Sequence, residues 1–224
     1  MVNYINVKKV VVNSKSIASR MRLSEQEDID KINEMCEQAV KIAKPKAIYK
    51  VCFISHREET STTIDDISFD STLMSRNFKD INRVFPFIAT CGREIYNWAN
   101  TITDVFERYW ADYIMESILR NAIRDLYDEI REKHGVSKIS SMNPGSLSGW
   151  PINQQQTLFS LLEQPDKKVG VELTETFLMI PQKSVSGILF PSGSDYVNCR
   201  LCDREICENR RAEYDEKVKK QLQG

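Results

Sequence analysis

Three closely spaced cysteines are the residues of this sequence that most clearly could carry out chemistry. Cys199, Cys202 and Cys207 follow the spacing C-x2-C-x4-C. Thiolates at this spacing wrap a tetrahedral metal ion or an iron–sulfur cluster, and reducing conditions favour such chemistry over disulfides. The thiolate form would be favoured by four nearby arginines, Arg200, Arg204, Arg210 and Arg211. The sequence therefore predicts a metal or redox site at these three residues.

The sequence does not decide which metal ion or cluster this site binds. An iron–sulfur cluster usually takes four cysteines, so the fourth ligand would come from Cys36, Cys52, Cys91, a non-protein group or a partner. Zinc needs the same completion, and His56 and His134 are the available imidazoles. Unligated thiols are the third possibility. The other three cysteines are expected to be buried core thiols.

Composition argues against several classes of function. The 224 residues are 41% hydrophobic and 28% charged, with 31 basic and 32 acidic side chains. Such a balance gives no field that would draw the chain to nucleic acid or to a membrane surface. No apolar run approaches the roughly 18 residues of a membrane span, and Lys8 and Lys9 interrupt the first apolar stretch, unlike a secretory signal. We expect a cytoplasmic protein without nucleic-acid or membrane partners.

Helices and strands form separate groups along the chain. Residues 104–133 lack Gly and Pro and carry apolar side chains at four-residue steps, which predicts a long helix capped by Thr103 and ended by Gly135. Further helices are expected at residues 25–43, 92–98, 154–162 and 203–222. Strands are expected at residues 5–12, 47–55, 85–91, 169–173, 177–180 and 185–190, with an edge strand inside 58–71 and a loop after residue 12. This pattern indicates an α+β fold.

Three segments carry a resemblance to a known family. Residues 173–190 read LTETFLMIPQKSVSGILF, residues 141–150 read SMNPGSLSGW, and Ala111, Asp112 and Glu116 follow the spacing A-D-x-x-x-E. Together they resemble the reactivation domain of cobalamin-dependent methionine synthase. The first match is the strongest of the three.

The resemblance implies a C-shaped domain with a mainly antiparallel sheet and a long central helix, spanning residues 1–198, with a cysteine-containing tail at 199–224. It implies binding of S-adenosylmethionine and docking over the cobalamin of a corrinoid-binding methyltransferase, most directly methionine synthase, for reductive methylation. An electron donor such as flavodoxin or ferredoxin would act with it. An iron–sulfur cluster at the cysteines would serve as an electron relay, and corrinoid-facing thiols are the alternative.

The family motifs also assign the ligand-binding residues. Glu116 matches the family acid that suits a cationic sulfonium, although helix statistics alone fit a surface glutamate equally well. The remaining matched positions are Asn143, Pro144, Gly145, Ser146, Ser186 and Gly187; Pro144 and Gly145 would also suit a plain turn.

Some positions depart from the family pattern. The family has Arg and Tyr where this sequence has Ser141 and Ser146, and an aromatic residue where it has Ile188-Leu189. A serine offers one hydroxyl where a guanidinium pairs a carboxylate bidentately. Two other functions remain as alternatives: a self-standing S-adenosylmethionine-dependent methyltransferase, and a non-catalytic module that binds corrinoid proteins.

Overall fold

The computed structural model describes residues 1–147, 149–191, 197–207 and 210–223. Within them lies an eight-stranded sheet whose paired strands are all antiparallel. Its strands are β1 (Val2–Asn6), β2 (Lys46–Lys50), β3 (Cys52–Arg57), β4 (Ser61–Ile64), β5 (Ile67–Asp70), β6 (Arg83–Thr90), β7 (Ile139–Met142) and β10 (Ser184–Pro191). Strands β8 (Glu172–Leu173) and β9 (Met179–Ile180) form a separate hairpin.

Strand β6 is the centre of the sheet. It pairs with β2 and β3 along one edge and with β10 along the other, and every residue after Arg83 is buried. Because side chains alternate along a strand, Phe85, Phe87 and Ala89 enter one core cluster while Ile88 enters another on the opposite face. Residues 85–91 were expected to form a buried strand, and this expectation is confirmed.

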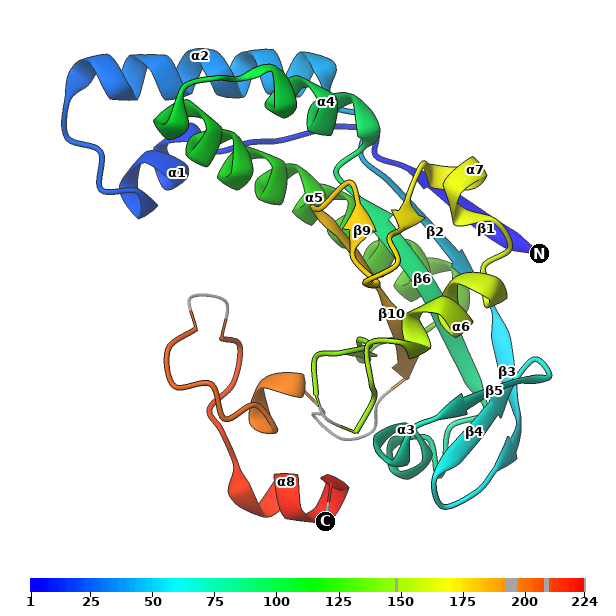
Figure 1. Ribbon diagram of the computed structural model, residues 1–224. Helices are drawn as coiled ribbons and strands as arrows, with labels where there is room; N and C mark the ends of the chain where they lie inside the picture. The colour runs from blue at the N-terminus through cyan, green and yellow to red at the C-terminus, as the bar shows by residue number, and fades with distance from the viewer. Residues whose placement is uncertain (148, 192–196, 208–209, 224) are drawn as a thin grey trace.

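Helices cover both faces of the sheet (Figure 1). They are α1 (Ser14–Arg20), α2 (Gln26–Ile42), α3 (Thr72–Asn77), α4 (Arg93–Thr101), α5 (Val105–His134), α6 (Gln154–Leu161), α7 (Pro165–Val169) and α8 (Glu216–Gln223), with a 3-10 turn at Asn198–Arg200. The core between the sheet and α1, α2, α4 and α5 is the larger one, and α6 and α7 pack on the other face. The expected α+β fold, with an antiparallel sheet and a long helix, is confirmed.

Helix α5 has the length that its sequence predicts. The Asp104 side chain caps it by accepting hydrogen bonds from the backbone N–H groups of Phe106 and Glu107, at 2.8 and 2.9 Å. Thr103 was expected as the cap; Asp104 takes this place because its carboxylate accepts from two otherwise unpaired N–H groups. The helix ends at Gly135, whose φ of 64° is left-handed.

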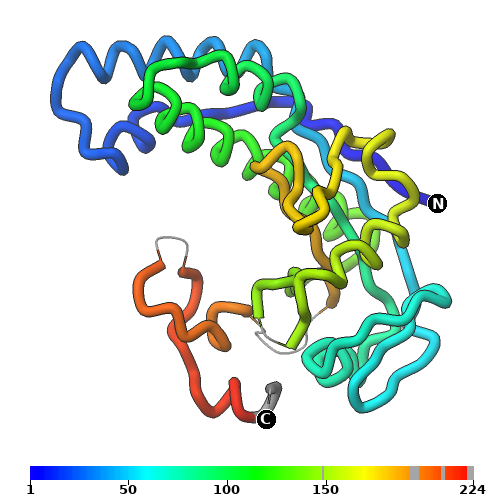
Figure 2. The backbone as a smooth tube through the Cα atoms, viewed as in Figure 1, coloured from blue at the N-terminus to red at the C-terminus, as the bar shows by residue number. Residues whose placement is uncertain are grey.

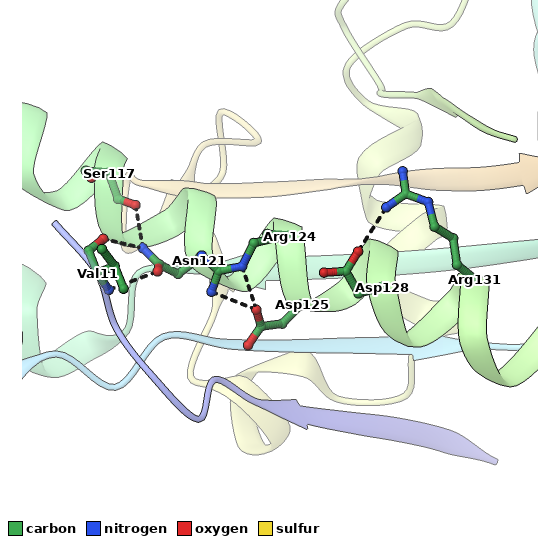
Figure 3. Close-up of polar contacts among 7 residues, drawn as sticks. All are labelled: Val11, Ser117, Asn121, Arg124, Asp125, Asp128 and Arg131. Carbon is green, nitrogen blue, oxygen red and sulfur yellow. Dashed lines mark hydrogen bonds and ion pairs between the residues drawn. The ribbon is translucent and has the colours of Figure 1, made fainter. Parts of the chain in front are cut away.

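The segment after β1 is held by a side chain of α5. The amide of buried Asn121 accepts from the backbone N–H of Val11 and donates to its carbonyl, both at 3.0 Å, and also donates to the carbonyl of Ser117 (Figure 3). The strand expected at residues 5–12 therefore ends at Asn6, since Val11 finds its partners on the helix. Where a loop was expected, Asn13 caps α1.

Two further strand predictions need correction. The strand expected at residues 47–55 is interrupted at Val51, but β2 and β3 pair with β6 in a single continuous register. Residues 58–71 contain two strands where one was expected. Asp65 and Asp66, with φ of 45° and 66°, make the tight turn that joins β4 to β5.

The C-terminal third differs most from expectation. The strand expected at residues 169–173 is the end of α7 followed by two-residue β8, and the helix expected at 203–222 is limited to α8. The Asp215 N–H donates a hydrogen bond to the Arg200 carbonyl at 2.8 Å, which brings these two positions together. Leu201 packs into a core cluster with Trp150. The boundary at residue 198 stays a prediction.

The backbone as a whole traces a C (Figure 2). Helices α1, α2 and α5 form one arm of the C. The described C-terminal residues, 197–207 and 210–223, lie opposite this arm, and we call them the C-terminal segment. Among the described residues, no helix combines the length and the apolar character needed to cross a membrane.

Candidate functional site

A cavity of about 660 Å³ lies between α5, the sheet and the C-terminal segment. We call it the Glu116 pocket. Its apolar wall is made by Phe87, Leu119, Ile123 and Val185, and its polar lining by Glu116, Arg120, Tyr127, Ser141, Asn143, Cys199, Arg210 and Arg211. Small-molecule sites commonly have volumes of about 300–1,000 Å³ and combine apolar walls with a few polar groups. The pocket has the size and character of such a site.

Helix periodicity places the α5 residues on one stripe. Glu116, Arg120, Ile123 and Tyr127 follow one another at steps of four, three and four residues, so they share a face of the helix. Another face, with Ile118 among its buried residues, packs into the core. The core contacts therefore fix which face of α5 is presented to the pocket.

Glu116 belongs to a small ion-pair network. Its Oε1 lies 2.6 Å from the Arg120 guanidinium and 3.9 Å from that of Arg20, which stacks over the ring of Tyr113 at 4.9 Å. The Glu116 side chain is 23% exposed. Its carboxylate is thus fixed in position by two guanidinium groups and remains accessible from the pocket.

Asn143 lies on the pocket wall beside Gly187 of β10, whose missing side chain leaves room for the Asn143 amide. Its Nδ2 donates to the Ser186 carbonyl at 2.7 Å. A Cβ at Gly187 would lie 2.6 Å from that same nitrogen and would also collide with the Met142 carbonyl oxygen. Val185 faces the pocket, so the Ser186 side chain points to the opposite side of β10, where it is buried. Ser186 and Gly187 therefore support Asn143 without lining the pocket.

The Pro-Gly loop stands behind the pocket wall. Gly145 has φ of 74°, donates its N–H to the Trp150 carbonyl at 2.8 Å and packs against Ile152. Pro144 is buried and Ser146 is exposed. None of these three loop residues lines the pocket, whereas Glu116, Asn143 and Cys199 do. Ligand binding by the whole predicted set stays a prediction.

Several pocket residues escaped the sequence interpretation. Phe87, Arg120 and Tyr127 carry no motif, although the spacing from Glu116 along α5 could have indicated the last two. Arg210 and Arg211 were considered only for their effect on nearby thiols. Their place on the pocket wall depends on the irregular path of the C-terminal segment, which has no periodic signature.

Cys199 lies at the edge of the same pocket. Its Sγ accepts a hydrogen bond from the Arg211 backbone N–H at 3.4 Å. Burial raises its pKa, but the N–H groups of Arg211 and Ala212 and the charge of Arg211 outweigh burial, so the pKa of Cys199 is lowered. By contrast, burial raises the pKa of Cys36 to about 11 and that of Cys91 to about 12, as expected for core thiols.

The three clustered cysteines do not form a ready metal site. Within the part of the chain that the structure describes, no three or more His, Cys, Asp or Glu side chains are grouped as metal ligands. Cys199, Cys202 and Cys207 are all half-buried thiols. An iron–sulfur or zinc site would require this segment to rearrange or to receive ligands from elsewhere, and it stays a prediction.

A second cavity, of about 670 Å³, lies at the N-terminal end of α5. Glu27, Asp104, Phe106 and Glu107 are among its lining residues, and the Lys31 Nζ lies 3.4 Å from the Glu107 carboxylate. No residue predicted to bind a ligand lines it. The Glu116 pocket is therefore the candidate site.

The fold is shared with a solved structure. This chain resembles the "Crystal Structure of the MetH Reactivation Domain bound to AdoHcy", with a TM-score of 0.63 and 16% sequence identity over 88% of this chain and 81% of that chain. At this identity the likeness establishes the fold: that of a methionine synthase reactivation domain.

Sequence comparison identifies the family. Residues 96–214 match the model of the vitamin B12 dependent methionine synthase activation domain, so the chain belongs to this family. The matched range contains all of α5, the Pro-Gly loop, β10 and the clustered cysteines. No curated protein sequence matches the chain.

Proposed function

We propose that this protein binds S-adenosylmethionine in the Glu116 pocket and supports the reductive reactivation of a cobalamin-dependent methyltransferase, most directly methionine synthase. Family membership supports the reactivation role. The solved relative, which has S-adenosylhomocysteine bound, supports the choice of ligand. The observation that carries the proposal is that Glu116 and Asn143, both indicated by the family motifs, line one cavity of ligand size.

The chemistry of the pocket suits this ligand. A sulfonium is a cation with apolar substituents, so it is favoured beside a carboxylate and aromatic faces. Glu116 supplies the carboxylate, and Phe87 and Tyr127 supply aromatic rings on the same pocket wall. The Asn143 side chain and the Ser141 hydroxyl offer hydrogen bonds to the polar parts of a nucleoside.

The partner's corrinoid is the methyl acceptor in this proposal. One electron from an external donor of the flavodoxin or ferredoxin class reduces Co(II) to Co(I). The Co(I) electron pair then forms the cobalt–carbon bond while the sulfur–methyl bond breaks, and the bonding pair of that bond stays on sulfur to give S-adenosylhomocysteine. Fast transfer removes Co(I) and so draws the unfavourable reduction forward. The protein contributes proximity and orientation rather than a nucleophile of its own.

The proposal is tested by mixing the protein with a cobalamin-loaded methionine synthase fragment in the Co(II) state, adding a reductant, and following methylcobalamin formation optically. We expect formation to require both this protein and S-adenosylmethionine. If methylcobalamin forms equally well without the protein, the proposal is wrong. Methyl transfer to another substrate without any corrinoid would support the self-standing methyltransferase instead.

A further inference from the structure

The Glu116 pocket contains more positive than negative charge. Glu116 is the acidic residue on its wall, whereas Arg120, Arg210 and Arg211 are basic. A purely cationic ligand would find this balance unfavourable. A ligand that carries both a cationic sulfonium and a carboxylate is matched by groups of both signs.

Two of the three arginines donate hydrogen bonds to oxygen atoms of the protein. The Arg120 guanidinium donates to Glu116 at 2.6 Å. The Arg210 guanidinium donates to the backbone carbonyls of Cys199 and Ala212, both at 3.5 Å, and to that of Arg204, so it holds the C-terminal segment in shape.

Arg211 is differently placed. Its backbone N–H donates to the Cys199 Sγ, its guanidinium also hydrogen-bonds that sulfur, and the exposed side chain lines the pocket. In the described part of the chain, no ion pair joins its guanidinium to a carboxylate. Ser141, on the same pocket wall, can offer a carboxylate only one hydroxyl, whereas a guanidinium can form two parallel hydrogen bonds with it.

We infer that Arg211 binds the carboxylate at the amino-acid end of the ligand. The inference rests on the proposed function, because it takes S-adenosylmethionine and its demethylated product as the ligands. It makes the C-terminal segment part of the binding site, and it makes Arg211 a determinant of specificity for nucleosides that carry an amino acid.

The contribution of the Arg211 contact can be measured by comparing two stable ligands that differ in the amino-acid end. S-adenosylhomocysteine carries the amino-acid end, and 5′-methylthioadenosine has the same nucleoside and a thioether but no carboxylate. Their affinities are measured by calorimetry on the full chain for the wild type, Arg211→Met, Arg211→Lys and Arg204→Met. Arg204 is the matched control, because its side chain is exposed in the same segment and does not line the pocket.

We expect Arg211→Met to weaken binding of S-adenosylhomocysteine about tenfold, as for a charge-assisted hydrogen bond at an exposed position, and to leave 5′-methylthioadenosine unchanged. Arg211→Lys should lose less, and Arg204→Met should change neither affinity. Unchanged 5′-methylthioadenosine binding also shows that the pocket of the variant is intact.

The two possible failures are distinct. If Arg211→Met binds S-adenosylhomocysteine as tightly as the wild type does, the role of Arg211 is wrong and the proposed function stands. If the wild type binds neither nucleoside, the proposed function itself fails, and this inference fails with it.

Discussion

At the scale of single residues, Glu116 is the side chain whose environment bears most directly on function. Both guanidinium contacts, from Arg120 and Arg20, reach its Oε1. Removing its charge would take away the negative charge that lies beside the Arg120 and Arg20 guanidinium groups. A positively charged ligand would then be opposed, while a neutral thioether would be little affected.

We therefore predict that Glu116→Gln weakens binding of S-adenosylmethionine about tenfold and changes that of S-adenosylhomocysteine less than about twofold. Calorimetry with both ligands checks this, and Glu132→Gln on an exposed part of the same helix is the control. Equal losses for both ligands would show that Glu116 does not act through the sulfonium charge.

His134 gives a pH-dependent prediction. Burial lowers its pKa, Arg83 and Lys133 lower it further, and Glu129 opposes them. Its Nε2 lies 3.0 Å from the Tyr49 hydroxyl oxygen. Because the unfolded chain binds this proton more readily, the stability contributed by neutral His134 is complete above its ordinary pKa of 6.5 and is lost as the pH falls through the lowered value.

His134→Gln should accordingly flatten the acid side of the stability curve. Urea unfolding on either side of pH 6.5 should give a smaller fall in unfolding free energy for the variant than for the wild type. An identical fall in both proteins would mean that His134 does not carry this dependence.

At the scale of elements, the contact between Asn121 and Val11 shows how a helix orders an irregular segment. One buried amide satisfies both backbone groups of Val11 and places the chain that leads into α1. Helix α1 in turn carries Arg20 to Glu116. The N-terminal segment and the pocket are thus connected through α5.

We predict that Asn121→Ala lowers the unfolding free energy by about 2 kcal/mol, because it removes the three hydrogen bonds that this buried amide makes to the backbone of Val11 and Ser117. Chemical denaturation measures this loss. Asn97→Ala, at an exposed position of α4, should change stability by less than about 0.5 kcal/mol. A similar small effect at Asn121 would contradict the importance of this contact.

Periodic elements could be predicted from sequence, and irregular ones could not. The four-residue steps of α5 and the apolar run of β6 each specify one secondary structure. Residues 7–12 are rich in valine like a strand, yet the partner of Val11 is an amide 110 positions away, which no local pattern encodes. The same holds for the candidate site. Glu116 and Asn143 could be predicted because they lie in motifs, whereas Arg211 could not, because it reaches the pocket through an irregular segment.

At the scale of the whole molecule, the C shape brings the C-terminal segment to the pocket formed by α5 and the sheet. One of the clustered cysteines, Cys199, therefore lies on the wall of the proposed methyl-transfer site. Under the proposed function, a redox group held at Cys199 would lie near the partner's cobalt. This arrangement gives the predicted metal site a testable role as an electron relay.

If the cysteines hold an iron–sulfur cluster, protein purified without oxygen should contain iron and show broad thiolate–iron absorption in the visible range. Cys202→Ser should abolish that absorption, while Cys36→Ala, at a buried thiol outside the cluster, should retain it. Metal analysis that finds zinc would identify the other predicted ligand. Colourless anaerobic protein without iron would contradict the cluster.

The location of the ligand is the claim on which the rest depends, and a crystal structure of the complex with S-adenosylhomocysteine tests it most directly. We predict that the thioether sulfur lies beside Glu116, the nucleoside lies against Phe87 and Asn143, and the carboxylate lies at Arg211. A nucleoside bound in the second cavity, at the N-terminal end of α5, would contradict the account. So would a Glu116 pocket that stays empty at saturating ligand.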